Sequence, residues 1–177
     1  MKIENLADTI FQFTEQQTIS QPFNNDFFNH FMQISNIVID SNNTHEFLSS
    51  FRGHICSIRA HENFTKTMFE EITRKWYMLC YLTTLEIHSC EQLDSFIGIS
   101  NLSHLTKLTL RRCNDIKSGV YEIGALTKLE YLEIVPVELS SLKLFSLLTN
   151  LIDLRLWSNV PNLDGISTMT KLRKLIN

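Results

Sequence analysis

The chain has 177 residues, of which 44% are hydrophobic and 20% are charged, and it carries a net charge of -3 with a pI near 6.1. This composition excludes a wholly disordered chain, and the length suits one ordinary domain with an apolar core. The acidic balance disfavours nucleic-acid binding, which needs a basic surface, so we expect no nucleic-acid partner.

The N-terminal residues Met1 to Asp8 include acidic side chains where a signal peptide would have an unbroken apolar stretch. The longest apolar run, Trp76 to Leu82, is shorter than the roughly 20 residues that span a bilayer. The four cysteines form no C-x-x-C pair, which agrees with a reducing compartment. We therefore expect a cytoplasmic protein without a membrane partner.

One phrase recurs along the chain: apolar, two variable residues, apolar, one variable residue, apolar, two variable residues, then Asn or Cys. The copies are Ile34, Ile37, Ile39, Asn42; Ile55, Ile58, Ala60, Asn63; Leu82, Leu85, Ile87, Cys90; Leu105, Leu108, Leu110, Cys113; Leu129, Leu132, Ile134, Val137; Leu151, Leu154, Leu156, Asn159; and an incomplete copy at Leu172 and Leu175. They begin 21 to 27 residues apart, and such a period indicates a repeat architecture. Val137 departs from the pattern, so we expect an irregular bend beside Pro136.

The phrase and its period resemble the leucine-rich-repeat family. The segments Leu126 to Leu129 and Leu148 to Leu151 resemble the short repeat class of bacterial internalins. The resemblance implies an α/β solenoid with a curved parallel sheet on its concave face and helices or 3₁₀ turns on its convex face. We expect an N-terminal helical cap over residues 1–33 and the repeat array over residues 34–177.

Side chains alternate along a strand, so Leu85 and Ile87 should face the core while Thr84, Glu86 and His88 face outward. Between strands, apolar residues recur at every third position over 93–105 and 139–151, a spacing that favours 3₁₀ turns or short extended segments over a long α-helix. The second repeat differs, because Phe64, Met68, Ile72, Trp76 and Leu79 have helical spacing.

Both ends of the chain depart from the repeat. In residues 1–33, Leu6, Ile10 and Phe13 would share one helical face, which favours a cap that shields the first repeat. The alternative is an F-box-like adaptor segment, although a Leu-Pro opening is lacking. At the other end the last strand phrase has no polar cap. We expect that the chain either associates with another molecule through this end or, as we favour, is part of a longer array.

The outward residues of the strands form the candidate partner-binding site on the concave face. The candidates are Arg59, His61, Glu86, His88, Lys107, Arg111, Tyr131, Glu133, Arg155 and Trp157. Within one column Arg59 should neighbour Glu86, and Glu133 should neighbour Arg155, so these pairs could simply stabilise the sheet. Arg155, Tyr131 and Trp157 are the most suggestive, because Arg and aromatic residues are common interface anchors.

The sequence contains no phosphate-binding glycine loop, nucleophile elbow or paired metal motif. His61 and His88 occupy equivalent positions in adjacent repeats, but a metal would need further ligands. We therefore expect no catalytic site, metal or cofactor. The leading hypothesis is a non-catalytic protein–protein interaction module with an unidentified protein partner. The alternatives are the substrate-recognition part of a ubiquitin-ligase adaptor or bacterial effector, and a structural repeat fragment.

Overall fold

The computed structural model describes residues 18–19, 36–39, 55–60, 64–74, 77, 79–88, 93–112, 116, 118–135, 139–157 and 160–176, with side chains from residue 55 onward. In this part of the chain, no helix is both long enough and apolar enough to cross a membrane.

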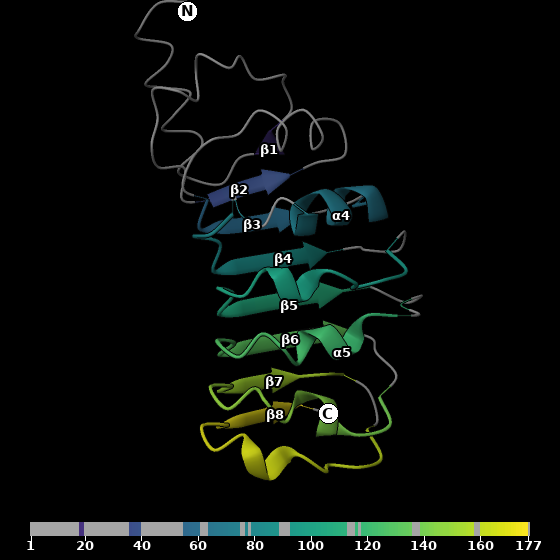
Figure 1. The fold of residues 1–177 in the computed structure, drawn as a ribbon. Coiled ribbons are helices and arrows are strands. Elements are labelled where there is room, and N and C mark those ends of the chain that lie inside the picture. The colour runs from purple at the N-terminus through teal and green to yellow at the C-terminus, as the bar shows by residue number, and fades with distance from the viewer. Residues whose placement is uncertain are drawn as a thin grey trace, which may run out of the picture.

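Within the described ranges, eight parallel strands form one sheet in which each strand pairs with the next one along the chain (Figure 1). Their bounds are β1 (Thr18–Ile19), β2 (Asn36–Ile39), β3 (Ser57–Ala60), β4 (Thr84–His88), β5 (Lys107–Arg111), β6 (Tyr131–Val135), β7 (Asp153–Arg155) and β8 (Lys174–Ile176). From β2 onward, each repeat phrase contributes one strand. The structure therefore fits a leucine-rich-repeat-like solenoid, as the sequence predicted.

The register of the sheet follows the repeat phrase. The first strand residues pair in series, from Ser57 through Thr84, Lys107, Tyr131 and Asp153 to Lys174. Because equivalent residues of successive repeats lie side by side, each position of the phrase becomes a column that crosses the strands. The alternation of inward and outward residues is confirmed from β3 to β7, where Ile58, Leu85, Leu108, Leu132 and Leu154 are fully buried.

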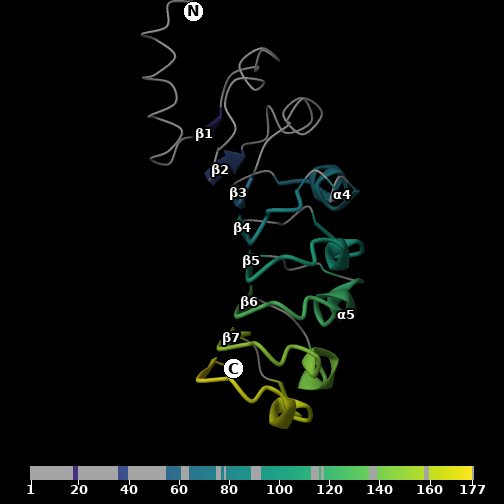
Figure 2. The ribbon, with the colours of Figure 1, turned by 60° about the vertical axis from the view of Figure 1, so that its left-hand side comes forward.

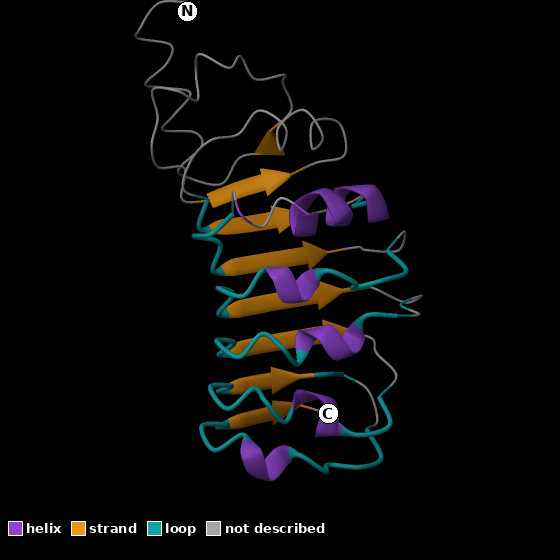
Figure 3. Cartoon of the chain, in the orientation of Figure 1, coloured by secondary structure: helices purple, strands orange, loops and turns teal. Residues whose placement is uncertain are grey.

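The helical segments lie on one side of the sheet and the strands line the inner side of a shallow curve (Figure 2). Among the described residues, the helical elements are α4 (Lys66–Arg74), η2 (Ile99–Asn101), α5 (Val120–Ile123), η3 (Leu142–Phe145) and η4 (Ile166–Thr168). Figure 3 shows that a helical element connects neighbouring strands from β3 to β8. The core lies between the helical layer and the sheet, and the inward strand residues are part of it.

The spacing of apolar residues correctly predicted most of the convex segments. Leu93, Phe96, Ile99, Leu102 and Leu105 are all buried around the 3₁₀ helix η2, and the equivalent residues of 139–151 are buried around η3. The predicted longer helix of the second repeat is α4. The segment between β5 and β6 contains the short helix α5. The sequence analysis had not predicted this helix.

A ladder of backbone hydrogen bonds fixes the stacking of the repeats just before each strand. The carbonyl of Thr83 accepts hydrogen bonds from the N–H groups of Thr106 and Lys107, at 2.8 and 3.0 Å. The carbonyl of Thr106 accepts in the same way from Glu130 and Tyr131. The hydroxyl of Thr106 adds a third bond to the Thr83 carbonyl. These bonds fix the position of the first strand residues, including Lys107 and Tyr131, relative to the preceding repeat.

Gly119 shows how tightly the convex segments stack. Its φ of 81° lies in the left-handed region, and a Cβ there would lie 2.3 Å from the backbone nitrogen of Ile97 in the preceding repeat. Only glycine combines this conformation with such a close approach.

Several predictions fall on residues outside the described part of the chain. These include the Asn or Cys positions that end each strand phrase, the bend at Pro136 and Val137, and most of the predicted cap over residues 1–33. The described part of that range is β1, which pairs in parallel with β2, so the sheet already includes residues before position 34.

Candidate partner-binding face

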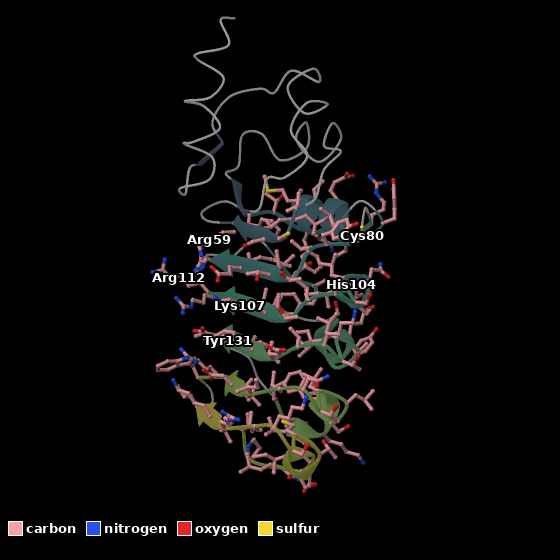
Figure 4. All side chains as sticks on the ribbon, turned by 90° about the vertical axis from the view of Figure 1, so that its left-hand side faces the viewer. Arg59, Cys80, His104, Lys107, Arg112 and Tyr131 are labelled. Carbon is pink, nitrogen blue, oxygen red and sulfur yellow. The ribbon has the colours of Figure 1, made fainter. Side chains whose placement is uncertain are left out.

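The outward side chains of β3 to β8 form a continuous surface that we call the concave face. It comprises Ser57, Arg59, Thr84, Glu86, His88, Lys107, Thr109, Arg111, Tyr131, Glu133, Val135, Asp153, Arg155, Lys174 and Ile176. Figure 4 shows Arg59, Lys107 and Tyr131 on this side of the molecule, while Cys80 and His104 lie on the helical side. Eight of the ten predicted site residues belong to the concave face; His61 lies outside the described residues, and Trp157 follows the end of β7.

Glu86 on β4 is shared by cations from both neighbouring strands. The Nε of Arg59 on β3 donates to its Oε2 at 2.6 Å, and the Nζ of Lys107 on β5 donates to its Oε1. His88 on the same strand approaches Oε2 at 3.8 Å. The predicted Arg59–Glu86 pair is therefore confirmed, and Lys107 is an additional partner that the sequence analysis did not name.

The environment of Glu86 sets its charge. Burial by itself would raise the pKa of this carboxyl, but the hydrogen bonds and charges of Lys107 and Arg59 outweigh burial and lower the pKa to about 2. Glu86 is therefore ionised at neutral pH although only 6% of its surface is exposed.

Glu133 on β6 is the centre of a second cluster. The guanidinium of Arg111 donates to both carboxylate oxygens, at 2.9 and 3.0 Å, and the Tyr131 hydroxyl donates to Oε2. Burial opposes ionisation of Glu133, but the bonds from Arg111 and Tyr131 prevail and lower its pKa. Bidentate Arg–carboxylate bonds of this kind are among the stronger ion pairs in proteins.

The predicted pairing of Glu133 with Arg155 is only partly correct. The two residues are opposite each other in the register of β6 and β7, but Arg155 donates to both oxygens of Asp153 on its own strand, at distances from 2.7 to 3.2 Å. These bonds lower the pKa of Asp153 and raise that of Arg155. Asp153 satisfies Arg155 locally, so Glu133 is bound by Arg111 from the other neighbouring strand.

Thr109 explains why the two clusters have the same form. It occupies the middle position of β5, between Lys107 and Arg111, and pairs in register with both Glu86 and Glu133. Its side chain is uncharged and forms no ion pair with either glutamate. Lys107 therefore reaches diagonally to Glu86 on one side, and Arg111 reaches diagonally to Glu133 on the other.

Tyr131 connects the clusters through its ring. The Nζ of Lys107 lies 5.4 Å from the ring centroid and the Cζ of Arg155 lies 5.1 Å from it, both within cation–π range. These cations come from the two strands that flank β6. Burial and the hydrogen bond to Glu133 raise the pKa of Tyr131 to about 12, so the hydroxyl remains a donor at neutral pH.

The prediction that Trp157 lies on a strand is wrong. β7 ends at Arg155, and the last bond of this pairing is donated by the N–H of Leu156 to the carbonyl of Ile176. Trp157 then adopts a left-handed φ of 48°, which turns the chain out of the extended conformation. Trp157 is 56% exposed, two residues beyond the end of β7.

The described residues contain no group of three or more His, Cys, Asp or Glu side chains that could hold a metal ion. Because His61 lies outside the described residues, its expected approach to His88 stays a prediction. What the sequence reasoning missed is the importance of Asp153 and the burial of Glu86 and Glu133. The available signal was the alternation of acidic and basic residues between neighbouring strands.

Comparisons with known proteins add little to this description. No protein-family model matches the chain, and no curated protein matches its sequence. Among solved structures, an internalin of Listeria monocytogenes is similar, with 13% sequence identity and a TM-score of 0.49. The match covers 98% of this chain but spans only 57% of the internalin. The assignment of the fold therefore depends on the repeat phrase and the strand register of this chain itself.

Proposed function

We propose that the chain is a non-catalytic protein–protein interaction module that binds a protein partner on its concave face. The observation that carries the proposal is a layer of Arg, Lys and Tyr side chains held by ion pairs on consecutive strands. Arginine and tyrosine are enriched at the energetic centres of protein interfaces. Their positions are fixed before binding, which lowers the entropic cost of association.

The exposed Trp157, two residues after the end of β7, supports the same proposal. Together with Arg155, two residues earlier in the chain, it supplies residue types that often anchor protein partners. The partner would lie across several strands, since the connected side chains extend from Arg59 on β3 to Arg155 on β7.

The test compares affinity captures by three immobilised proteins: the unmodified chain, the double variant Arg155→Ala with Trp157→Ala, and the control Tyr121→Ala with Leu147→Ala. The control also removes two exposed side chains, 67% and 63% exposed, but on the helical side. We expect the captured proteins to be retained by the control and lost by the concave-face variant, with unchanged circular dichroism for both. Equal capture by all three proteins, or equal loss from both variants, would contradict the proposal.

A further inference from the structure

The concave face and the whole chain have opposite net charge. The described strands β3 to β8 present five cations outward, Arg59, Lys107, Arg111, Arg155 and Lys174, against three carboxylates, Glu86, Glu133 and Asp153. The face therefore has two positive charges in excess, whereas the chain has a net charge of -3. Such local segregation of charge determines which partners are attracted and how they are oriented.

The cations also form the outer layer of this face. The side chains of Glu86 and Glu133 are 8% and 4% exposed, whereas those of Arg59, Lys107 and Arg111 are 38%, 42% and 46% exposed. Over β4 and β6, an approaching molecule therefore meets ammonium and guanidinium groups before it meets Glu86 or Glu133. At β7 the exposures are closer, at 26% for Arg155 and 18% for Asp153. A guanidinium has five N–H donors and an ammonium has three, so these groups can bind a second acceptor without releasing the first.

The arrangement of the cations favours an occupant that crosses the strands. Arg59 and Arg155 occupy the same column on β3 and β7. Midway between them on β5, Lys107 and Arg111 stand on either side of the short Thr109. A chain laid along this column would meet positive charge at every second strand, and two strand spacings amount to about 9.6 Å. A polyproline-II segment advances about 9.3 Å in the three residues of one turn, so every third side chain faces the same way.

We propose that the concave face binds an acidic polypeptide segment that runs across the strands in an extended, polyproline-II-like conformation, with a carboxylate at about every third residue. This inference rests on the proposed function and names its partner class. The carboxylates of the segment would bind over Arg59, between Lys107 and Arg111, and beside Arg155.

A nucleic acid fits these observations less well. Each cation cluster contains a carboxylate, and the excess of two charges is small beside the dense charge of a phosphate backbone. The overall negative charge of the chain would also repel a long polyanion. Separate carboxylates at regular intervals on an extended peptide can align with individual cation clusters and avoid the buried acids.

The direct test is fluorescence anisotropy with a labelled peptide of repeated Glu-Pro-Pro triplets. A second peptide has the same composition but all its Glu residues in one block, and a single-stranded oligonucleotide represents the other class of polyanion. We expect the spaced peptide to bind tightest and to lose about fivefold in affinity between about 50 and about 300 mM salt. Equal or tighter binding of the block peptide or the oligonucleotide would overturn the proposal.

The double variant Lys107→Gln with Arg111→Gln tests the site itself. It leaves Glu86 bonded to Arg59 and Glu133 bonded to Tyr131, so neither buried carboxylate loses all its donors. We expect about fivefold weaker peptide binding with unchanged circular dichroism, as the loss of exposed charge pairs implies. The control Lys128→Gln with Lys143→Gln changes net charge equally at exposed positions away from the strands and should bind like the unmodified chain. Unchanged binding by the first variant, or equal weakening by the control, would overturn the proposal.

This experiment and the capture experiment can fail separately. If no acidic peptide binds but protein capture still depends on Arg155 and Trp157, the acidic-segment proposal is wrong and the interaction module stands. If capture is insensitive to the concave-face variant, the proposed function itself is wrong.

Discussion

Leu85 and Glu86 are neighbours on β4, and both are almost fully removed from solvent, but for different reasons. Leu85 belongs to the core side of the sheet, where the convex layer covers it. Glu86 belongs to the concave face, where Arg59 and Lys107 from neighbouring strands cover it. Leu132 and Glu133 on β6 repeat the contrast. The core side is covered by the packed convex layer, whereas the carboxylates of the concave face are covered by long cationic side chains that are themselves 38 to 46% exposed.

The largest effect should come from placing a charge on the core side. We expect Leu108→Asp or Leu132→Asp to unfold the array, at a cost of more than about 4 kcal/mol, because both sites are fully buried among apolar side chains. Urea denaturation followed by circular dichroism measures the effect. Lys107→Asp, on the outward side of the same strand as Leu108, should retain a cooperative unfolding transition. If this variant also unfolded, the two sides of the sheet would not differ in their tolerance of a new charge.

A smaller, pH-dependent effect is expected from Glu86. Its folded pKa of about 2 lies below its ordinary value of 4.5, so its contribution to stability is present above about pH 4.5 and is lost as the pH falls toward 2. The shift sets an upper limit of about 3 kcal/mol at neutral pH. Glu86→Gln should therefore lower the free energy of unfolding at pH 6. At about pH 2.5 the difference in the free energy of unfolding between the variant and the unmodified chain should be much smaller. A stability gap that stays constant with pH would show that the ion pairs of Glu86 do not stabilise the fold.

The smallest effect is expected from Tyr131→Phe, which removes the hydroxyl bonded to Glu133 but keeps the ring between Lys107 and Arg155. Loss of this hydrogen bond to a charged group should cost about 1.5 kcal/mol or less, because Arg111 continues to bind Glu133 through two bonds. Urea denaturation measures the loss. Spectrophotometric titration of the unmodified protein should show a tyrosine with a pKa near 12 that is missing from the variant; four tyrosines with ordinary titration would contradict the assigned environment.

The concave face could be anticipated from the sequence only in part. The repeat phrase predicted all ten candidate residues on the outward side of the strands, and the structure places eight of them there. A period-two alternation leaves little freedom once the inward leucines are fixed. The phrase also predicted the contact of Arg59 with Glu86. The phrase did not predict that Glu133 would pair with Arg111 and not with Arg155. Both cations lie on strands next to β6, and their positions in the repeat do not show which of them forms the ion pair.

The sequence by itself determined the solenoid, its strand register and its core, because each copy of the phrase repeats the same inward leucines and stacks them on those of the next copy. The tertiary structure alone decided the details that depend on neighbouring side chains and local backbone conformation. These are the left-handed turn at Trp157, the short helix α5, and the burial of Glu86 and Glu133 beneath cations from adjacent strands. The physical reason is that apolar periodicity specifies which side of a strand is buried, whereas the geometry of ion pairs depends on the reach and competition of side chains far apart in sequence.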